Sequence, residues 1–149
     1  MFITQLSVYL ENDKGTLRSL TKILAENNID ILALSVADTT HFGIIRIVVR
    51  EGDIDVAIKT LRENGFMAKT NNVVCVAVPN QPSGLDGVLA VIEKNNISIE
   101  YMYSLNYIIG NKALLVLRLS AENMEKEQIA ETLLKQGITL IKQEEINRL

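Results

Sequence analysis

The stretch NDKGTLRSLTKILAENNIDI, residues 12–31, has a second copy in the same chain. Sixty-eight positions further on, residues 80–99 read NQPSGLDGVLAVIEKNNISI. Each copy opens on a polar corner, continues with apolar residues at helical spacing and closes on Asn-Asn-Ile-x-Ile. Because similarity at a fixed period marks a repeated structural unit, we predict two copies of one unit of about seventy residues. Two further matches extend the copies: GIIRIVVR (43–50) with KALLVLRL (112–119), and TLRENGF (60–66) with TLLKQGI (132–138).

Hydrophobic periodicity in each copy changes from two to 3.6 and back, which predicts the element order β-α-β-β-α-β. The expected strands span residues 3–10, 31–37, 44–49 and 66–70 in the first copy, and 73–78, 99–105, 113–119 and 139–146 in the second. The expected helices contain the apolar residues of 17–24, 54–61, 85–92 and 129–134. Asn27 with Asn28, Gly65 and Gly137 are predicted to end helices, Asp53 to cap one, and DTTHFG (38–43) and Gly110-Asn111 to form turns.

This element order is the ferredoxin-like motif of the α+β class, with a four-stranded antiparallel sheet and both helices on one face. We predict two such domains, residues 1–71 and residues 72–149. Pairing of their edge strands would join the sheets into one wider sheet and cover edges that promote aggregation. The alternative is two independent domains on a flexible linker. The absence of Pro, Gly and Ser from residues 70–73 disfavours that alternative.

The composition excludes several classes of function. The chain has 149 residues, of which 48% are hydrophobic and 22% charged, and its net charge is -3. No block of Lys or Arg provides the positive surface that nucleic-acid binding requires. No apolar run reaches the ~18 residues of a membrane span, and the N-terminus has no basic leader. We therefore expect a soluble, cytoplasmic protein that binds neither nucleic acid nor membranes.

The chain lacks the residues that catalysis and metal binding require. Its one histidine, His41, falls in the predicted turn DTTHFG, away from the other polar residues of interest. Its one cysteine, Cys75, lies in the apolar run VVCVAV, where a buried side chain is expected. Asp30 and Asp38 are isolated among apolar neighbours. The motifs of zinc proteases, thiol redox proteins, serine hydrolases and P-loop proteins are absent, so we expect no enzyme, no metal and no cofactor.

Two protein classes with the same element order also lack their residues here. RNA-binding domains stack bases on aromatic side chains of the central strands. The corresponding strands QLSVYL and IIRIVV contain only Tyr9, and VVCVAV and LLVLRL contain no ring. Acylphosphatases hold phosphate with an arginine in the first loop, and neither LENDKGTL (10–17) nor PNQPSGL (79–85) contains arginine.

The first strand-to-helix corner of each copy contains small and polar residues. Gly15 and Thr16 in one copy, and Ser83 and Gly84 in the other, let a ligand approach the backbone closely. The N–H groups at the start of the following helix favour a carboxylate, and Asp13 accepts hydrogen bonds from an ammonium group. Together these groups suit an amino acid. Because such residues also cap helices and form turns, a purely structural role is the alternative.

The corner NDKGTL and the helix end NNIDI resemble an ACT domain, whose signature is a D-x-x-G-x-L or D-K-P-G-x-L-type corner and a helix ending in N-x-I-x-I. NQPSGL and NNISI resemble a second one, so the whole chain resembles stand-alone tandem ACT proteins. The resemblance implies that an amino acid or similar small molecule binds where the corner of one unit meets the second strand of a neighbouring unit. The implied ligand-binding residues are Asn12, Asp13, Lys14, Gly15, Thr16, Leu17, Asn28, Ile29, Asp30 and Ile31 in the first copy, and Asn80, Gln81, Pro82, Ser83, Gly84, Leu85, Asn96, Ile97, Ser98 and Ile99 in the second.

The two copies differ at positions that bear on binding. Gln81 stands in the place of the acidic Asp13, so the second corner lacks a carboxylate for an ammonium group. On the strand after the helix, Tyr101 and Tyr103 replace two small residues of the first copy. These tyrosines either pack the junction between the copies or offer a ring and a hydroxyl to a ligand. We expect unequal sites, with the Asp13 corner occupied if only one is.

Most ACT domains regulate an attached catalytic domain, and we expect none on this chain. The resemblance therefore implies an amino-acid-responsive regulatory or sensor protein that acts in trans. Its allosteric signal would pass through a homo-oligomer, such as a homodimer, to a partner enzyme. The alternative is an ACT assembly module whose corners are only helix caps and whose ligand has been lost.

Overall fold

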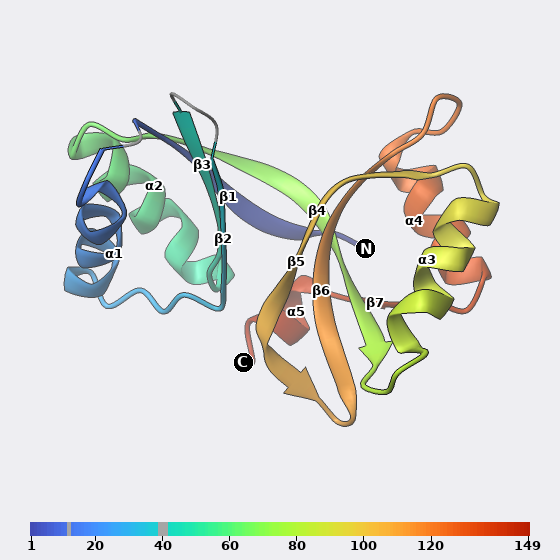
Figure 1. Cartoon of the computed structure of the whole chain (residues 1–149). Helices are drawn as coiled ribbons and strands as arrows, with labels where there is room; N and C mark the ends of the chain where they lie inside the picture. The colour runs from blue at the N-terminus through green and yellow to red at the C-terminus, as the bar shows by residue number, and fades with distance from the viewer. Residues whose placement is uncertain (12, 39–41) are drawn as a thin grey trace. The chain divides into compact units, whose positions relative to one another are not determined.

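The chain folds into two compact units in the computed structural model. The first unit is residues 4–71, and the second unit is residues 72–149 together with residues 1–3. Figure 1 shows in each unit a sheet with a pair of helices packed on one face. The residues described are 1–11, 13–38 and 42–149.

The sheet of the first unit has the strand order β2-β3-β1-β4, and β3 is antiparallel to both β1 and β2. Its elements are β1 (Ile3–Glu11), α1 (Thr16–Glu26), β2 (Ala33–Asp38), β3 (Phe42–Val48), a 3-10 turn (Glu51–Asp53), α2 (Ile54–Glu63) and the first part of β4 (Met67–Pro79).

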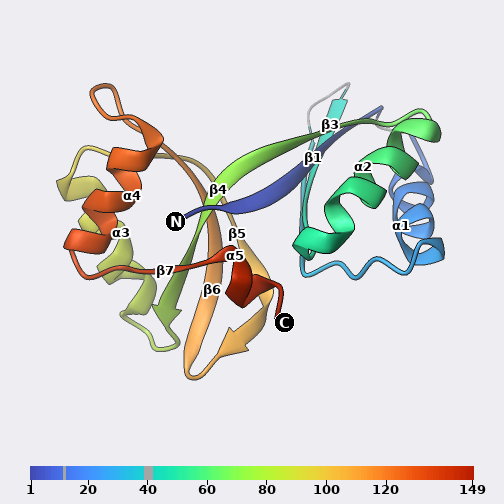
Figure 2. The same ribbon diagram turned by 180° about the vertical axis from the view of Figure 1, so that it is seen from behind.

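The sheet of the second unit has the order β5-β6-β4-β7, with neighbouring strands antiparallel. Its elements are the rest of β4, α3 (Gly84–Lys94), β5 (Ser98–Ile109), β6 (Lys112–Ser120), α4 (Lys126–Lys135), β7 (Thr139–Ile141) and α5 (Gln143–Ile146). In chain order, both units therefore place their strands as second, third, first, fourth. Figures 1 and 2 show the short α5 on the side of the sheet away from α3 and α4.

The two helices of each unit bury one face of its sheet. In the first unit, Leu20 and Leu24 of α1 and Leu61 of α2 are fully buried against alternate residues of β1 and β3. Burial of one leucine side chain contributes about 1.5 to 3 kcal/mol, so this contact is the main stabilising term of the unit. The corresponding core of the second unit contains Val74, Val76, Val78, Val88, Ile92, Ile97, Leu117, Ile129, Ala130, Leu133 and Leu140. The predicted α+β class and the helix-on-one-face arrangement are confirmed.

The repeated Asn-Asn pair ends α1 and α3 in the same way. The first asparagine turns its side chain back onto the helix, with Asn27 Nδ2 donating to Ile23 O and Asn95 Nδ2 to Val91 O, both at 2.8 Å. The second has a left-handed backbone, with φ 56 at Asn28 and 55 at Asn96. Asparagine is one of the few residues that adopts this conformation at modest cost. The prediction that these pairs end helices is confirmed.

The strand register corrects one alignment made from sequence. Val8 pairs with Ile45 in the first unit, and Val76, its counterpart, pairs with Leu115. Ile45 therefore corresponds to Leu115, whereas aligning GIIRIVVR with KALLVLRL places it over Leu114. Because side chains alternate between the faces of a strand, this shift of one residue exchanges core and opposite face. The runs IIRIVV and LLVLRL have apolar residues at consecutive positions, so both registers place apolar side chains in the core. The sequence alone therefore did not decide between the two registers.

Other differences concern the ends of the units. The predicted strands 66–70 and 73–78 form one continuous strand, β4, so no linker separates the copies. The predicted strand 139–146 stops at Ile141, and α5 follows. There the backbone N–H of Lys142 donates to Glu145 Oε2 at 2.8 Å, which starts a helical turn instead of a strand. Asp53 ends the 3-10 turn and makes no side-chain hydrogen bond to cap α2.

Two expectations stay predictions. The predicted turn DTTHFG includes residues 39–41, His41 among them, which lie outside the described residues. The joining of the two sheets into one wider sheet also stays a prediction.

Gly84 and Gly87 of α3 provide a matched test of packing at the second corner. A Cβ at Gly84 would overlap the carbonyl oxygen of Pro79, whereas a Cβ at Gly87 meets no atom within 4 Å. Gly84→Ala should therefore lower the free energy of unfolding by about 1 to 3 kcal/mol. Gly87→Ala should raise it by about 0.5 to 1 kcal/mol through lower backbone entropy of the unfolded chain. Urea denaturation measures both, and equal effects would contradict the packing argument.

Candidate functional site

The two strand-to-helix corners share three backbone hydrogen bonds, which recur 68 residues apart. The cap residues differ in conformation, with φ 84 at Gly15 and φ -94 at Ser83. The pairs are Asp13 N to Glu11 O (2.9 Å) with Gln81 N to Pro79 O (2.8 Å), Thr16 N to Asp13 O (3.3 Å) with Gly84 N to Gln81 O (2.9 Å), and Ser19 N to Gly15 O (2.9 Å) with Gly87 N to Ser83 O (3.1 Å).

At the start of α1 and of α3, two backbone N–H groups have no acceptor among the described residues. They belong to Leu17 and Arg18 at the first corner, and to Leu85 and Asp86 at the second corner. These are the second and third residues of α1 and of α3. Such donors, together with the helix dipole, favour a negatively charged group.

The acidic side chain of the first corner is not used as a helix cap. The cap position is Gly15, which has φ 84 and no side chain to accept a hydrogen bond. Thr16 Oγ1 donates to the backbone oxygen of Asp13 at 2.9 Å, and this hydrogen bond stabilises the turn. The side-chain carboxylate of Asp13 takes no part in it. At the second corner, Ser83 occupies the cap position and makes no side-chain cap hydrogen bond either.

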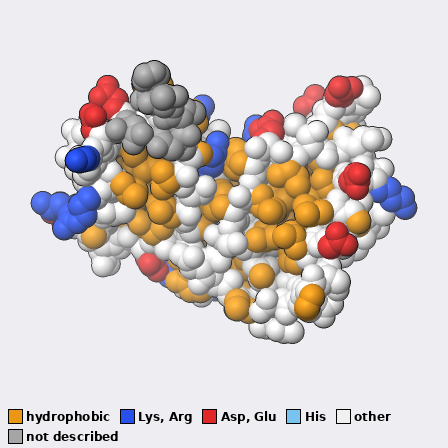
Figure 3. All heavy atoms as spheres, viewed as in Figure 1, with side chains coloured by type: hydrophobic (Ala, Val, Ile, Leu, Met, Phe, Trp, Pro, Cys, Tyr) orange, Lys and Arg blue, Asp and Glu red, His pale blue; other side chains and the backbone are white. Residues whose placement is uncertain are grey.

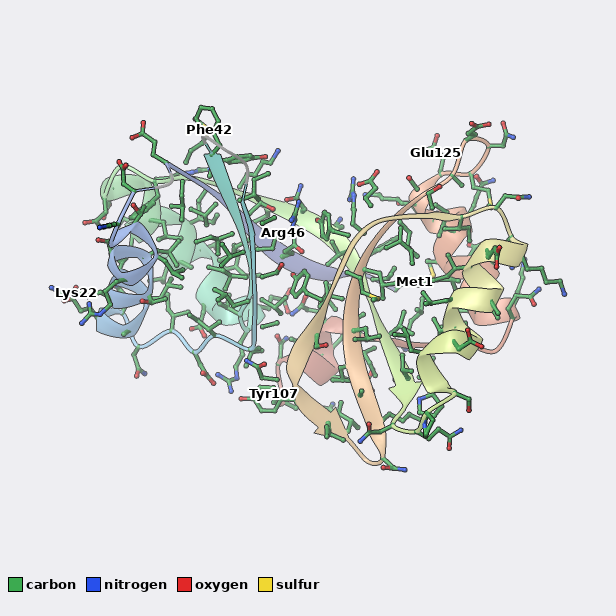
Figure 4. All side chains as sticks on the ribbon, viewed as in Figure 1. Met1, Lys22, Phe42, Arg46, Tyr107 and Glu125 are labelled. Carbon is green, nitrogen blue, oxygen red and sulfur yellow. The ribbon has the colours of Figure 1, made fainter. Side chains whose placement is uncertain are left out.

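A cavity of about 370 Å³ opens beside Asp13 in the first unit. Its lining comes from the end of β1, the start of α1, the start of β3 and the start of β4. The lining residues are Tyr9, Leu10, Glu11, Asp13, Thr16, Phe42, Gly65, Phe66 and Met67. Figure 4 shows the ring of Phe42 projecting at the end of β3. Asp13 and Thr16 were predicted from sequence, and the apolar lining was missed because it comes from three separate strands.

A second cavity, of about 670 Å³, lies in the second unit at the C-terminal end of α3, the end away from the second corner. It is formed by the C-terminal end of α3 and the connection from β6 to α4. The lining residues are Glu93, Asn95, Asn96, Ile97, Ser98, Ala121, Glu122, Asn123 and Met124. The predicted residues Asn96, Ile97 and Ser98 are thus grouped together, whereas Gln81 and Ser83 lie at the other end of the helix.

The helix end of the first unit is arranged differently. There Arg50 Nη2 lies 3.3 Å from Asp30 Oδ2, so the carboxylate of Asp30 is engaged in an ion pair. Ile29 is 6% exposed and belongs to the core, and Ile31 packs against the same core. These side chains therefore stabilise the unit, and exposed Asn28 owes its identity to its left-handed backbone.

The predicted residues of one unit fall into two groups, because the corner and the helix end lie at opposite ends of an 11-residue helix. At 1.5 Å per residue this helix separates the groups by about 16 Å, further than one amino acid extends. A ligand touching both groups would have to lie between two different units or two copies of the chain. Lys14, Pro82 and Asn80 are exposed at the corners. Asn12 lies outside the described residues.

The two tyrosines of β5 lie next to each other. Tyr101 and Tyr103 have ring centroids 6.5 Å apart and stack at 25°. Tyr103 pairs with Val116 on β6, on the opposite face from the core residue Leu117. The rings are therefore directed away from α3, and neither lines the cavity at its C-terminal end. Ile99, in contrast, lies beside α3.

The described residues contain no cluster that could hold a metal, and their cysteine is buried. Among residues 1–11, 13–38 and 42–149, no three His, Cys, Asp or Glu side chains are grouped so that they could hold a metal. Cys75 is buried, and this burial raises the pKa of its thiol to about 12, with the negative charge of Glu145 adding to the effect. A thiol with this pKa is protonated near neutral pH and is a poor nucleophile. None of the helices described has the length and apolarity needed to cross a membrane.

Comparison with known proteins identifies the family. A family model described as the ACT domain pair matches residues 1–149. The chain belongs to the ACT domain pair family. Protein BT0572 from Bacteroides thetaiotaomicron is 35% identical to this ACT domain pair, with a TM-score of 0.86, and the match covers 100% of this chain and 98% of that chain. No relative was found among curated proteins.

Two more distant structures share the ACT fold. The regulatory subunit of aspartate kinase from Thermus thermophilus, in its ligand-free form, is 15% identical with a TM-score of 0.57, over 87% of this chain and 91% of that chain. The regulatory subunit of aspartate kinase from Thermus flavus is 13% identical with a TM-score of 0.56, over 89% and 90%. The family and the fold predicted from the corner motifs are thereby confirmed.

Because the Cys75 thiol is buried, the free energy of unfolding of this ACT domain pair should fall as the pH becomes alkaline. Cys75 has an ordinary pKa of 9.0 that is raised to about 12 in the folded chain. The unfolded chain therefore loses this proton first, and the stabilising effect of the raised pKa is present below pH 9 and lost as the pH rises towards 12. We expect the stability advantage of wild type over Cys75→Ala to shrink between pH 8 and pH 11, as measured by urea denaturation. A constant difference would contradict burial as the cause.

Proposed function

We propose that this ACT domain pair binds a free amino acid at the first corner and acts as a regulatory or sensor protein. The observation that supports the proposal is the grouping at this corner of an exposed carboxylate, Asp13, two outward N–H groups and a cavity sized for one small molecule. Pockets that bind small ligands measure about 300 to 1,000 Å³, so a cavity of about 370 Å³ suits an amino acid better than a nucleotide.

The groups at the corner match the two charges of an amino acid. The N–H groups of Leu17 and Arg18 at the start of α1 would receive the carboxylate, as helix N-termini commonly do. Asp13, with Glu11 on the same cavity, would accept hydrogen bonds from the ammonium group. Charge-assisted hydrogen bonds are about twice as strong as neutral ones, so these contacts would select a zwitterion.

We propose that the second corner binds weakly or takes another ligand. It repeats three backbone hydrogen bonds of the first corner, yet Gln81 stands where the first corner has Asp13, and Pro79 where it has Glu11. An ammonium group at this place would meet no carboxylate. The two corners are therefore expected to differ in affinity, with the first occupied at lower ligand concentration.

A regulatory role is supported by the fold of the chain. The matching structures from two Thermus species are regulatory subunits of aspartate kinase, and the described residues of the present chain contain no cluster that could hold a metal. We propose that it works in trans as a cytoplasmic homo-oligomer that alters a partner enzyme when the amino acid binds. We keep residues 1–71 and 72–149 as the proposed ACT domains.

An assembly role is the second candidate. The strand β5 is at the edge of the sheet of the second unit, and it exposes Ile108 (60%), Met102 (38%) and Ile99 (36%). Figure 3 shows apolar side chains gathered over the region of the second unit between its sheet and α3. Edge strands with exposed apolar residues favour pairing with another chain. This role and amino-acid binding are compatible, because the exposed edge and the first corner belong to different units.

The proposal is tested by thermal denaturation of the full chain with each common amino acid. A ligand present at about 100 times its dissociation constant should stabilise the fold by about 2.7 kcal/mol, which raises the Tm by about 5 to 10 °C for a chain of this size. Asp13→Ala should abolish the shift. Because the Asp13 side chain caps no helix, the variant without ligand should stay within about 0.5 kcal/mol of wild type.

Gln81→Ala is the matched control, since it removes the counterpart side chain from the second corner. It should retain the shift produced by the ligand of the first corner. If Asp13→Ala lowers the Tm of the unliganded chain as much as it lowers that of the liganded chain, Asp13 is structural and the proposed site is wrong. If no amino acid shifts the wild-type Tm, the assembly role is favoured.

A further inference from the structure

We infer that the amino acid bound at the first corner has a large apolar side chain, which lies against Phe42 and Met67. This inference rests on the proposed function and specifies the ligand of the same site. It is drawn from the lining of the cavity beside Asp13, from the exposure of that lining and from the residues that replace it in the second unit.

The most exposed large apolar side chains of the described residues meet at this cavity. Met67 is 72% exposed and Phe42 is 63% exposed, and both line it. They are the first residues of β3 and β4, so the fold places them on the same cavity although the sequence separates them. Apolar surface held in water is unfavourable, and a ligand that covers it recovers the hydrophobic free energy. A small or polar amino acid would leave this surface wet.

Half-buried aromatic rings form the rest of the apolar wall. Phe66 packs against the core of the first unit, and the Nζ of Lys69 lies 5.3 Å from the ring centroid of Tyr9. Both rings are thus held by neighbours inside the protein. The wall therefore combines two half-buried rings with the exposed side chains of Phe42 and Met67.

Charge is placed at one edge of the same cavity. Glu11 and Phe42 are directly paired across β1 and β3, and Asp13 lies two residues beyond Glu11. The cavity thus has two carboxylates beside an apolar wall. This is the complement of an amino acid with an ammonium group at one end and a hydrocarbon side chain at the other. An apolar acid without the ammonium group would be repelled by the two carboxylates.

The second unit lacks this combination, although its strands pair in the same way. The pair Glu11 and Phe42 corresponds to Pro79 and Lys112, which are paired across β4 and β6. The sequence Gly65-Phe66-Met67 corresponds to Gly137-Ile138-Thr139 after the second helix of each unit. In the second unit a base stands in place of a ring, and a hydroxyl in place of a thioether. The apolar wall and the acidic edge are therefore both present in the first unit and both absent from the second, as expected if they serve one ligand.

The test is isothermal titration calorimetry of the full chain with L-phenylalanine, L-leucine, L-alanine and L-serine. One methylene group in an apolar pocket changes affinity by about 10-fold or more, so wild type should bind phenylalanine or leucine at least about 10-fold more tightly than alanine or serine. The double variant Phe42→Ser, Met67→Thr should weaken binding of the preferred amino acid about 10-fold or more and change alanine less than about 2-fold. Both positions are exposed, so the variant should fold, and the single variant Met67→Thr should show the same direction of change.

Leu134→Ser is the matched control, because Leu134 of α4 is an exposed apolar residue (44%) that is not among the residues lining this cavity. It should leave every affinity unchanged. If serine or alanine binds as tightly as phenylalanine and leucine, or if the double variant keeps the wild-type preference, the inference is overturned while the proposed function stands. If none of the twenty common amino acids binds wild type, both are overturned.

Discussion

The burial of one sheet face under two helices is the constraint on which the rest of this protein depends. Leu20 and Leu24 of α1 pack on alternate residues of β1 and β3, and the second unit repeats the arrangement with Val88 and Ile92 of α3. The chain must therefore pass from the sheet layer to the helix layer within a few residues. At the first corner Gly15 makes this passage in a left-handed conformation at φ 84, and at the second corner Ser83 makes it with φ -94. The corner that results presents its backbone N–H groups to solvent.

The comparison of the two units separates what the fold requires from what a ligand requires. The backbone hydrogen bonds of the corners and the asparagine helix ends are the same in both units. The side chains around the corners are not the same: Asp13, Glu11 and Phe42 have the counterparts Gln81, Pro79 and Lys112. Folding accounts for the shared features. The features of one unit alone are the ones to which a specific function is assigned.

The position of the cavity also bears on how occupancy would be transmitted. Its lining joins residues 9–11, 13 and 16 with residue 42 and residues 65–67, so a ligand would connect the ends of three strands with the start of a helix. One of these strands, β4, begins at Met67 and continues as one element to Pro79 at the second corner. Regulation requires that the ligand prefer one arrangement of the protein over another. A continuous strand between the corners is a physical connection through which such a preference can act.

Local sequence determined the elements of this protein, and the tertiary structure decided what they bring together. Period changes, the Asn-Asn pairs and the repeat itself were sufficient for the fold class and for Asp13 and Thr16 at the corner, because these signals act between near neighbours. They were insufficient for the register of β6, where Leu114 and Leu115 are equally apolar. They were also insufficient for α5, whose first turn is held by the hydrogen bond between Lys142 N and Glu145 Oε2 together with backbone hydrogen bonds. The cavity wall of Phe42, Phe66 and Met67 was also out of reach. Only the pairing of distant strands brings those side chains to Asp13, since no local pattern records which strand ends meet.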